Sequence, residues 1–263
     1  MGSKYIAPIE QELLIINKNT DVQSFTLNKP QKHFLEHMGH KNIILKARQM
    51  GFSSVILGYL TIRFLLKRNE RLVVVSHESG ATQKLMDRVK FFIESYEKGN
   101  KIKLPTKYNS RSEIVNEDTN STIYIGTAGS KSFGRGDTIT ALHLSEFAFY
   151  SNPEEMLAGV LQALTPEGVL FIESTANGFN FYKTLWDEAE DRGFSRHFYN
   201  SDWLYTHEFI ENKKKEMGRL FEQEYPTTPE EAFLTSGDMY FNGDSLKWYL
   251  SQVKDPTVGG IYV

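Results

Sequence analysis

The stretch Lys46-Ala-Arg-Gln-Met-Gly-Phe-Ser-Ser54 lies between an apolar run, Ile43-Ile-Leu45, and an apolar stretch of helical length from Val55 to Leu66. A strand, a glycine-containing turn and a helix in this order place backbone N–H groups at a helix N-terminus, where they bind phosphate oxygens. Laid on the pattern G-x-x-x-x-G-K-[ST], Gly51 and Ser53 occupy their expected positions. The stretch therefore predicts a phosphate-binding loop within an α/β fold.

Two positions of this loop depart from the usual pattern. Phe52 stands where the phosphate-contacting lysine is expected, and Lys46 stands where the first glycine is expected. The chain has lost the usual lysine and has gained one at the entrance of the loop. We interpret Lys46 as a candidate for the displaced phosphate lysine.

Composition bounds the class of protein. The chain has 263 residues, with 40% hydrophobic and 24% charged residues, which is typical of a globular protein with one large domain or a core domain and a small appendage. Its net charge of −3 does not by itself indicate a nucleic-acid partner, although a mildly acidic total can include a local basic surface. The chain has no cysteine, which excludes disulfides and thiolate metal sites. No apolar run approaches the roughly 20 residues that span a bilayer, so no membrane association is expected.

From residue 43 to about residue 175, short apolar runs alternate with amphipathic stretches, which is typical of a parallel sheet with crossover helices. The expected strands are Ile43–Leu45, Leu72–Ser76, Glu113–Val115, Thr122–Ile125, Ala141–Leu144 and Val169–Ser174. The expected helices are Ser53–Lys67, Ser79–Glu97, Pro153–Leu164 and Phe181–Arg192, with a further helix ending near His40. The pattern predicts an α/β fold with a mostly parallel sheet flanked by helices, and together with the phosphate loop it is typical of a P-loop NTPase.

Composition changes after residue 200. We expect a P-loop ATPase core over residues 1–200 and a small helical lid over residues 201–255, which is richer in charged and aromatic residues. Residues 256–263 resemble a linker at the start of a new strand, so we expect that the chain is one domain of a longer protein.

An acidic residue follows the strand expected at residues 141–144. Glu146 falls at the carboxyl end of that strand, where open parallel sheets bind ligands and where NTPases place the residue that activates water. Ser145 occupies the position at which an aspartate usually holds Mg²⁺ through its waters, so this carboxylate is missing and we expect looser metal binding. Alone, Glu146 would more often be an ordinary glutamate at the end of a strand, but with Gly51-Phe-Ser53 upstream the catalytic interpretation is favoured.

The run Glu173-Ser-Thr-Ala-Asn-Gly178 follows another strong strand. Small hydroxyl and amide side chains at a strand end can sense the γ-phosphate and pass the change to neighbouring segments. The same run is also compatible with a simple turn, because Asn-Gly favours turns.

In this order and spacing, these parts resemble the ATPase domain of the large terminase subunit, the motor that packages DNA into the capsids of tailed phages. Residues 46–54 look like the Walker A motif of that family, in which some members carry the lysine at the start of the loop. Residues 142–146 look like its Walker B motif, and residues 174–178 look like its coupling motif. Pro30-Gln31 matches its upstream glutamine motif, and residues 224–233 look like the segment before its nuclease domain.

The resemblance implies an α/β P-loop NTPase of the ASCE type, with ATP and Mg²⁺ as cofactors. Ser53 would bind Mg²⁺ directly, and Glu146 would polarise the attacking water and contact Mg²⁺ through water. Gln31 would contact adenine, because an amide side chain can pair with both N6 and N7. The residues implied in ATP binding are Gln31, Lys46, Arg48, Gln49, Met50, Gly51, Phe52, Ser53 and Ser54. The residues implied in coupling are Ser174, Thr175, Ala176, Asn177 and Gly178.

Two arginines are further catalytic candidates beside Glu146. Arg48 lies inside the loop, where a guanidinium could reach the γ-phosphate. Arg135 lies in Ser132-Phe-Gly-Arg-Gly136, and the resemblance implies that it could be the arginine finger of a neighbouring subunit in a ring. Arg135 is equally compatible with a role in capping a loop.

Two clusters of side chains have open interpretations. Lys98, Lys101, Lys103 and Lys107 could bind DNA phosphates non-specifically, or they could form an ordinary solvated surface. His33, His37 and His40 have spacing that suggests metal ligands, but no third ligand with recognisable spacing follows, and we interpret them as surface histidines.

The function implied by the resemblance is ATP hydrolysis coupled to translocation of double-stranded DNA into a procapsid. It further implies a homo-oligomeric ring, a portal protein and a small terminase subunit as partners, and the cytoplasm of the host cell as the location, docked on the procapsid. No nuclease activity is expected, since no set of carboxylates resembles a two-metal nuclease. Two alternatives stay open: a nucleic-acid translocase similar to superfamily 2, and a degenerate P-loop module that serves in assembly without hydrolysis.

Overall fold

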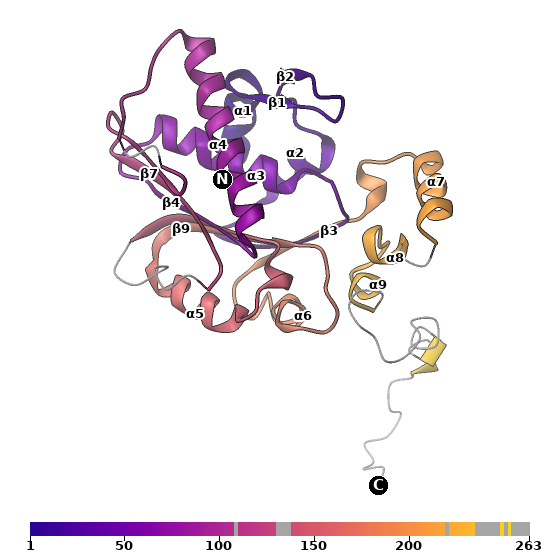
Figure 1. The fold of residues 1–263 in the computed structure, drawn as a ribbon. Coiled ribbons are helices and arrows are strands. Elements are labelled where there is room, and N and C mark those ends of the chain that lie inside the picture. The colour runs from indigo at the N-terminus through magenta and orange to yellow at the C-terminus, as the bar shows by residue number, and fades with distance from the viewer. Residues whose placement is uncertain (108–109, 130–137, 219–220, 235–247, 250–251, 254–263) are drawn as a thin grey trace.

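The computed structural model describes residues 1–107, 110–129, 138–218, 221–234, 248–249 and 252–253. Within these residues, eight strands form one central sheet (Figure 1). In spatial order the strands are β10 (Ser195–Tyr199), β3 (Lys41–Lys46), β9 (Leu164–Ser174), β8 (Ile139–Ser145), β4 (Arg71–Ser76), β7 (Ser121–Thr127), β6 (Glu113–Asn116) and β5 (Thr106–Lys107). All neighbours from β10 to β7 are parallel, and only β6 and β5 are added antiparallel. The prediction of a mostly parallel sheet is confirmed.

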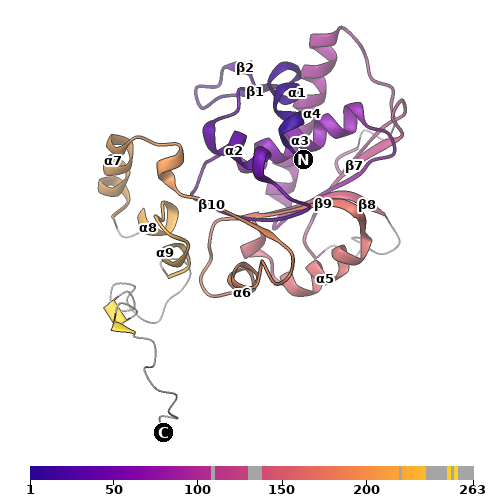
Figure 2. The same cartoon turned by 180° about the vertical axis from the view of Figure 1, so that it is seen from behind.

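Helices cover both faces of this sheet, as the two opposite views show (Figures 1 and 2). One face packs against α1 (Ile6–Glu12), α2 (Lys29–His37), α3 (Phe52–Leu66) and α4 (Ser79–Asn100). The other face packs against α5 (Pro153–Ala163) and α6 (Phe181–Asp187). Strands covered on both faces need apolar residues in both directions, which explains the continuous apolar runs in the sequence. Among the described helices, none combines the length and the apolar character needed to cross a bilayer.

The phosphate-loop helix α3 lies in the middle of one layer. It is buried along most of its surface, because α1 and α4 pack on it from outside and the sheet packs on it from inside. Gly58 lies where α3 meets α1 and Phe25, and a Cβ atom there would lie 3.2 Å from the Phe25 ring. A helix that is apolar on every side belongs inside the molecule, and its N-terminus is correspondingly fixed.

Several segments differ from the sequence-based prediction. The strand β10, the helix α1 and a hairpin of β1 (Leu14–Ile16) and β2 (Val22–Ser24) were not predicted. The helix predicted over residues 181–192 ends at Asp187. The acidic run that follows places negative charge at the helix C-terminus, where the helix dipole disfavours it, and only turns continue to Gly193.

The chain beyond residue 200 forms short helices beside the β10 edge of the sheet (Figure 2). They are α7 (His207–Met217), α8 (Phe221–Glu224) and α9 (Pro229–Leu234). No residue of α7 is buried, whereas α9 packs on the core through Phe233, whose ring centroid lies 6.1 Å from that of Tyr182. The division of the chain near residue 200 stays a prediction, and the expected linker at 256–263 lies outside the described residues.

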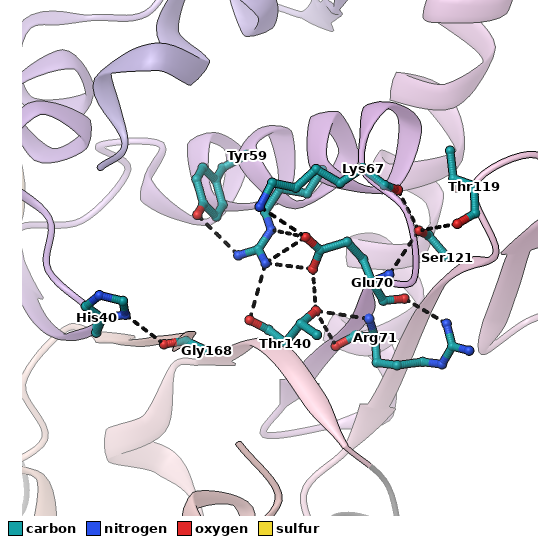
Figure 3. A network of polar contacts seen from close by, with 10 residues as sticks. His40, Tyr59, Lys67, Glu70, Arg71, Thr119, Ser121, Thr140 and Gly168 are labelled. Atoms are coloured by element: carbon teal, nitrogen blue, oxygen red, sulfur yellow. Dashed lines mark hydrogen bonds and ion pairs between the residues drawn. The ribbon is translucent and has the colours of Figure 1, made fainter. Parts of the chain in front are cut away.

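A buried polar network joins α3 to the amino ends of β4 and β8 (Figure 3). The Arg63 guanidinium donates to the Glu70 carboxylate at 2.6 Å, and the hydroxyls of Thr140 and Tyr59 complete the network. Burial alone would raise the pKa of Glu70, but the bonds from Thr140 and Arg63 outweigh it and lower this pKa. The network lies at the amino ends of the strands, whereas the phosphate loop lies at their carboxyl ends. We therefore assign it a role in stabilising the fold.

We predict that Glu70→Gln lowers the free energy of unfolding by about 3 kcal/mol, because it leaves the buried Arg63 guanidinium without a countercharge. Urea unfolding measures this loss, with Glu94→Gln on the exposed side of α4 as the control that stays near zero. The double substitution Arg63→Met with Glu70→Leu removes both charges and should recover most of the stability. A Glu70→Gln variant as stable as the parent would show that the ion pair contributes nothing.

Candidate active site

The loop between β3 and α3 has a backbone that only certain residues adopt. Gln49 and Gly51 have left-handed conformations, with φ angles of 60° and 76°. A Cβ atom on Gly51 would lie 2.6 Å from Nε2 of Gln31, so only glycine fits there. Among the described residues, no side chain caps the start of α3, which leaves the N–H groups of its first turn available to an anion.

Gln31 fixes this loop from α2. Its side-chain Nε2 donates to the carbonyl of Gly51 at 2.8 Å, and its Oε1 accepts from the backbone N–H of Asn28 at 3.0 Å. The Asn28 side chain in turn accepts from the Gln31 backbone, which forms a capping box at the start of α2. The side-chain oxygen and the side-chain nitrogen of Gln31 are therefore both hydrogen-bonded within the chain. The predicted contact to adenine stays a prediction, and it requires one of these bonds to be exchanged.

Phe52 explains why no lysine stands at the usual position. Its side chain is buried at the first turn of α3 and packs against Phe34 and Tyr199, with ring centroids 5.7 and 4.7 Å away. Tyr199 belongs to β10, the strand that the sequence did not predict. A side chain at position 52 faces the core, so only the backbone of Phe52 is available to a phosphate.

Lys46 ends β3 and is 6% exposed. Its Nζ lies 3.0 Å from Oε1 of Glu146 and 3.2 Å from Oε2 of Glu173. These two carboxylates come from the ends of β8 and β9, so three neighbouring strands bring one ammonium and two carboxylates together. An ammonium has three N–H donors, and one remains for a phosphate oxygen.

Both charges of the buried pair are stabilised in the folded protein. Burial disfavours the ammonium of Lys46, but the carboxylates of Glu173 and Glu146 outweigh it and raise the pKa of Lys46. Burial likewise disfavours the Glu173 carboxylate, but Lys46, then His143 and Ser53, hold the pKa of Glu173 far below its usual range. Lys46 is therefore a permanent cation, as a phosphate-binding lysine must be.

Glu146 follows β8 in a left-handed conformation, with a φ angle of 54°. Such a backbone is strained for a residue with a side chain, and strain of this kind is found at functional sites. Its Oε2 accepts from the backbone N–H of Thr175 at 3.3 Å and from the hydroxyl of Ser174 at 3.4 Å. The candidate coupling motif therefore contacts the candidate catalytic carboxylate directly.

The rest of the coupling motif holds the turn after Glu146. Ser174 Oγ accepts from the backbone N–H of Ala148 at 3.2 Å, and Asn177 donates to the carbonyl of Ala148 at 3.2 Å. Ala176 is buried in the core beneath, and Gly178 has a φ angle of 64°. A movement of the residues at the end of β9 would thus also move the segment that positions Glu146.

Glu173, for which the sequence indicated no separate role, is fully buried. Its Oε1 accepts from the hydroxyls of Ser53, at 2.6 Å, and Ser145, at 2.9 Å. A carboxylate therefore stands beside Ser145 after all, supplied by the neighbouring strand. The signal in the sequence was a charged residue at the end of an otherwise apolar strand.

The arginine candidates have different positions. The Arg48 side chain is 60% exposed and pairs with Glu224 of α8 at 2.6 Å, so it joins the loop to α8. Arg88 of α4 donates to Ser54 Oγ at 2.9 Å and was not predicted. The hydroxyl of Tyr205, which precedes α7, donates to the carbonyl of Gln49 in the loop at 3.2 Å. Arg135 lies outside the described residues, and its predicted role as an arginine finger stays a prediction.

Comparison with known proteins gives no match by sequence: no family profile and no curated protein matches the chain. Comparison with solved structures does. The large terminase of bacteriophage HK97 matches with a TM-score of 0.64 and 17% identity, over 89% of this chain and 50% of the other. The ATPase domain of the large terminase of Thermus phage P74-26 matches with a TM-score of 0.58 and 16% identity, over 74% of this chain and 91% of the other.

The chain has the fold of a large terminase ATPase domain. A further match is the large terminase of a thermophilic bacteriophage in complex with ADP, with a TM-score of 0.55 and 14% identity, over 71% of this chain and 47% of the other. The predicted P-loop NTPase fold is confirmed by these similarities, and the chain spans about half the length of the HK97 protein.

The lysine cluster identified from the sequence lies away from the phosphate loop. The candidate DNA-binding residues Lys98 and Lys101 are exposed at the far end of α4, and Lys103 pairs with Glu97 at 2.8 Å. Lys107 lies on the edge strand β5, and a DNA contact by this cluster stays a prediction.

The imidazoles of the three histidines all make hydrogen bonds within the chain. His33 bonds the hydroxyl of Tyr199 at 2.9 Å, His37 bonds the carbonyl of His33 at 2.8 Å, and His40 contacts the carbonyl of Gly168. Within the part of the chain that the structure describes, no group of three or more His, Asp or Glu side chains is arranged to hold a metal.

Proposed function

We propose that this chain is an ATP-hydrolysing motor domain that moves double-stranded DNA into a viral procapsid, as part of a terminase. The observation that supports this most directly is the convergence of Lys46, Glu146 and Ser53 at one edge of the sheet, beside the phosphate loop. The fold supports it as well, since the large terminase of the thermophilic bacteriophage, which has that fold, is known with ADP and with ATP-γ-S.

ATP would lie with its phosphates on the N-terminus of α3. Lys46 would donate its remaining N–H to the β- and γ-phosphates from the strand side of the loop. Glu146 would accept the proton of a water that attacks the γ-phosphorus, while the bond to the bridging oxygen of ADP breaks. Its left-handed backbone and its bonds to Ser174 and Thr175 fix the carboxylate for this task.

The residues present fit Mg²⁺ bound together with the nucleotide. The Ser53 hydroxyl donates its one hydrogen bond to Glu173. The lone pairs of the serine oxygen are therefore available to a cation. Mg²⁺ usually binds through one or two protein oxygens, waters and substrate phosphates, which agrees with a single serine ligand. When bound, Mg²⁺ would neutralise charge on the β- and γ-phosphates.

Two sets of contacts would transmit the structural change that follows the loss of the γ-phosphate. The coupling residues Ser174 and Thr175 contact Glu146, and Arg48 joins the loop to α8 of the lid. As a terminase, the motor would act as a homo-oligomeric ring with a portal protein and a small terminase subunit, on a procapsid in the host cytoplasm. Arg135 of a neighbour would then complete each site.

We predict that the chain hydrolyses ATP only with Mg²⁺, and that double-stranded DNA raises the rate. A phosphate-release assay with ATP alone, with Mg²⁺, and with Mg²⁺ plus DNA measures this. Arg135→Ala should reduce the rate by about three orders of magnitude without weakening ATP binding, because an arginine finger acts on the transition state.

The alternatives give different results in the same assay. A degenerate assembly module would bind the nucleotide and release no phosphate even at high chain concentration. A translocase of the superfamily-2 type would respond to single-stranded DNA or RNA more strongly than to double-stranded DNA. Either result would contradict the proposed function.

A further inference from the structure

The carboxylate of Glu173 joins three elements under the phosphate loop. One oxygen accepts from Ser53 on α3 and from Ser145 on β8, and the other lies 3.2 Å from the ammonium of Lys46 on β3. Its exposed fraction is zero, and Nε2 of His143 lies 3.4 Å from the oxygen that accepts from the two serines, so its charge and its orientation are set by these four partners. A buried carboxylate with this many partners is held in one position.

The register of the sheet explains why this glutamate reaches the position next to Ser145. Residues 145 and 173 are direct partners in the parallel pairing of β8 and β9. Side chains of such partners point to the same face, which here is the face covered by α3. A carboxylate at position 173 and a carboxylate at position 145 would therefore occupy nearly the same volume.

A carboxylate in this volume has two effects on the phosphate site. It accepts the hydrogen bond of the Ser53 hydroxyl, so that the serine presents lone pairs and not its hydrogen to a cation. It also balances the charge of Lys46, whose ammonium lies between the carboxylates of Glu146 and Glu173. Both effects orient groups that contact the nucleotide, although Glu173 itself need not contact it.

We propose that Glu173 supplies, from the neighbouring strand, the carboxylate that Ser145 lacks, and that it is the positioning residue which directs Ser53 toward the Mg²⁺ of a bound nucleoside triphosphate. This inference rests on the proposed function. It replaces the expectation of looser metal binding, because the carboxylate is relocated and not lost.

The test compares the affinity for ATP-γ-S in Mg²⁺ with the affinity in EDTA, by calorimetry. The gain in affinity that Mg²⁺ gives to the parent should fall at least about tenfold in Glu173→Gln, since loss of an outer carboxylate typically weakens metal binding 10–100-fold. A purely structural ion pair would change the unfolding midpoint and leave this gain intact, and that result overturns the inference.

Two further variants keep the test decisive if Glu173→Gln folds poorly. Glu173→Asp keeps the charge beside Lys46 but is shorter by one methylene, so it should fold and still lose most of the Mg²⁺ gain. The double variant Ser145→Asp with Glu173→Gln moves the carboxylate to the usual strand and should restore the gain. A double variant that keeps the deficit of Glu173→Gln contradicts the inference.

The outcome also separates this inference from the proposed function. A parent chain that binds ATP-γ-S equally with Mg²⁺ and with EDTA, or not at all, overturns both. A parent that gains affinity from Mg²⁺ while Glu173→Gln and Glu173→Asp gain equally leaves the proposed function in place and removes the role of Glu173.

Discussion

The Glu146→Gln variant is expected to lose about a thousandfold in the rate of ATP hydrolysis, within the range of 10² to 10⁴ typical for a general base. Glutamine has nearly the same size, but it cannot accept the proton of the attacking water. The backbone N–H of Thr175 and the hydroxyl of Ser174 can still donate to its amide oxygen, so the site should keep its shape. Binding of ATP-γ-S should therefore change by less than about threefold, or 0.7 kcal/mol.

A matched control lies at the same edge of the sheet. Glu78 lies two residues after the end of β4, and its side chain is 66% exposed with its carboxylate 3.9 Å from Nε2 of His77. Glu78→Gln should hydrolyse ATP at the rate of the parent. Measurements of phosphate release and of ATP-γ-S binding on both variants test whether Glu146 is the general base. A Glu146→Gln variant that hydrolyses ATP at the parent's rate excludes this role.

The Lys46→Met variant is expected to lose both stability and nucleotide affinity. Methionine matches the length of the lysine side chain, but it leaves the fully buried carboxylate of Glu173 without its cation. Removal of one partner of a buried ion pair typically costs about 3–5 kcal/mol. Urea unfolding measures this cost, with Lys41→Met at the half-buried start of the same strand as the control.

A second substitution separates the two losses. Lys46→Met combined with Glu173→Gln removes the uncompensated charge, so it should recover a large part of the stability. It should not recover nucleotide binding, because the phosphates still lack their cation. Full recovery of binding in the double variant would mean that Lys46 serves only to balance Glu173.

The sequence was sufficient to predict the elements that are local in the chain. The loop, its helix and the strands β3, β4 and β6 to β9 were found because apolar runs of strand and helix length alternate around glycine-containing turns, whereas β5 was not predicted. Lys46, Glu146 and the coupling residues were placed at strand ends, and parallel strands bring their carboxyl ends to one edge. Their meeting within 3.5 Å follows from that topology.

What could not be predicted depends on contacts between distant segments. The polar sequence of β10 becomes a strand because β3 offers it an edge, and Tyr199 on it packs against Phe52. In the sequence, Phe52 was only a departure from the lysine of the usual loop pattern, whereas in the structure it is a core residue. The pairing of residue 173 with residue 145 depends on the register of two strands, which no local pattern records.

Lys46 is expected to bind the phosphates of ATP from the strand side of the loop. Calorimetric titration of ATP-γ-S in EDTA, which removes the Mg²⁺ contribution expected of Glu173, into the parent, Lys41→Met and Lys46→Met combined with Glu173→Gln tests this role, because all three should be folded. The first two should bind alike, and the third should lose at least about tenfold in affinity, or 1.4 kcal/mol. Equal binding by all three would contradict it.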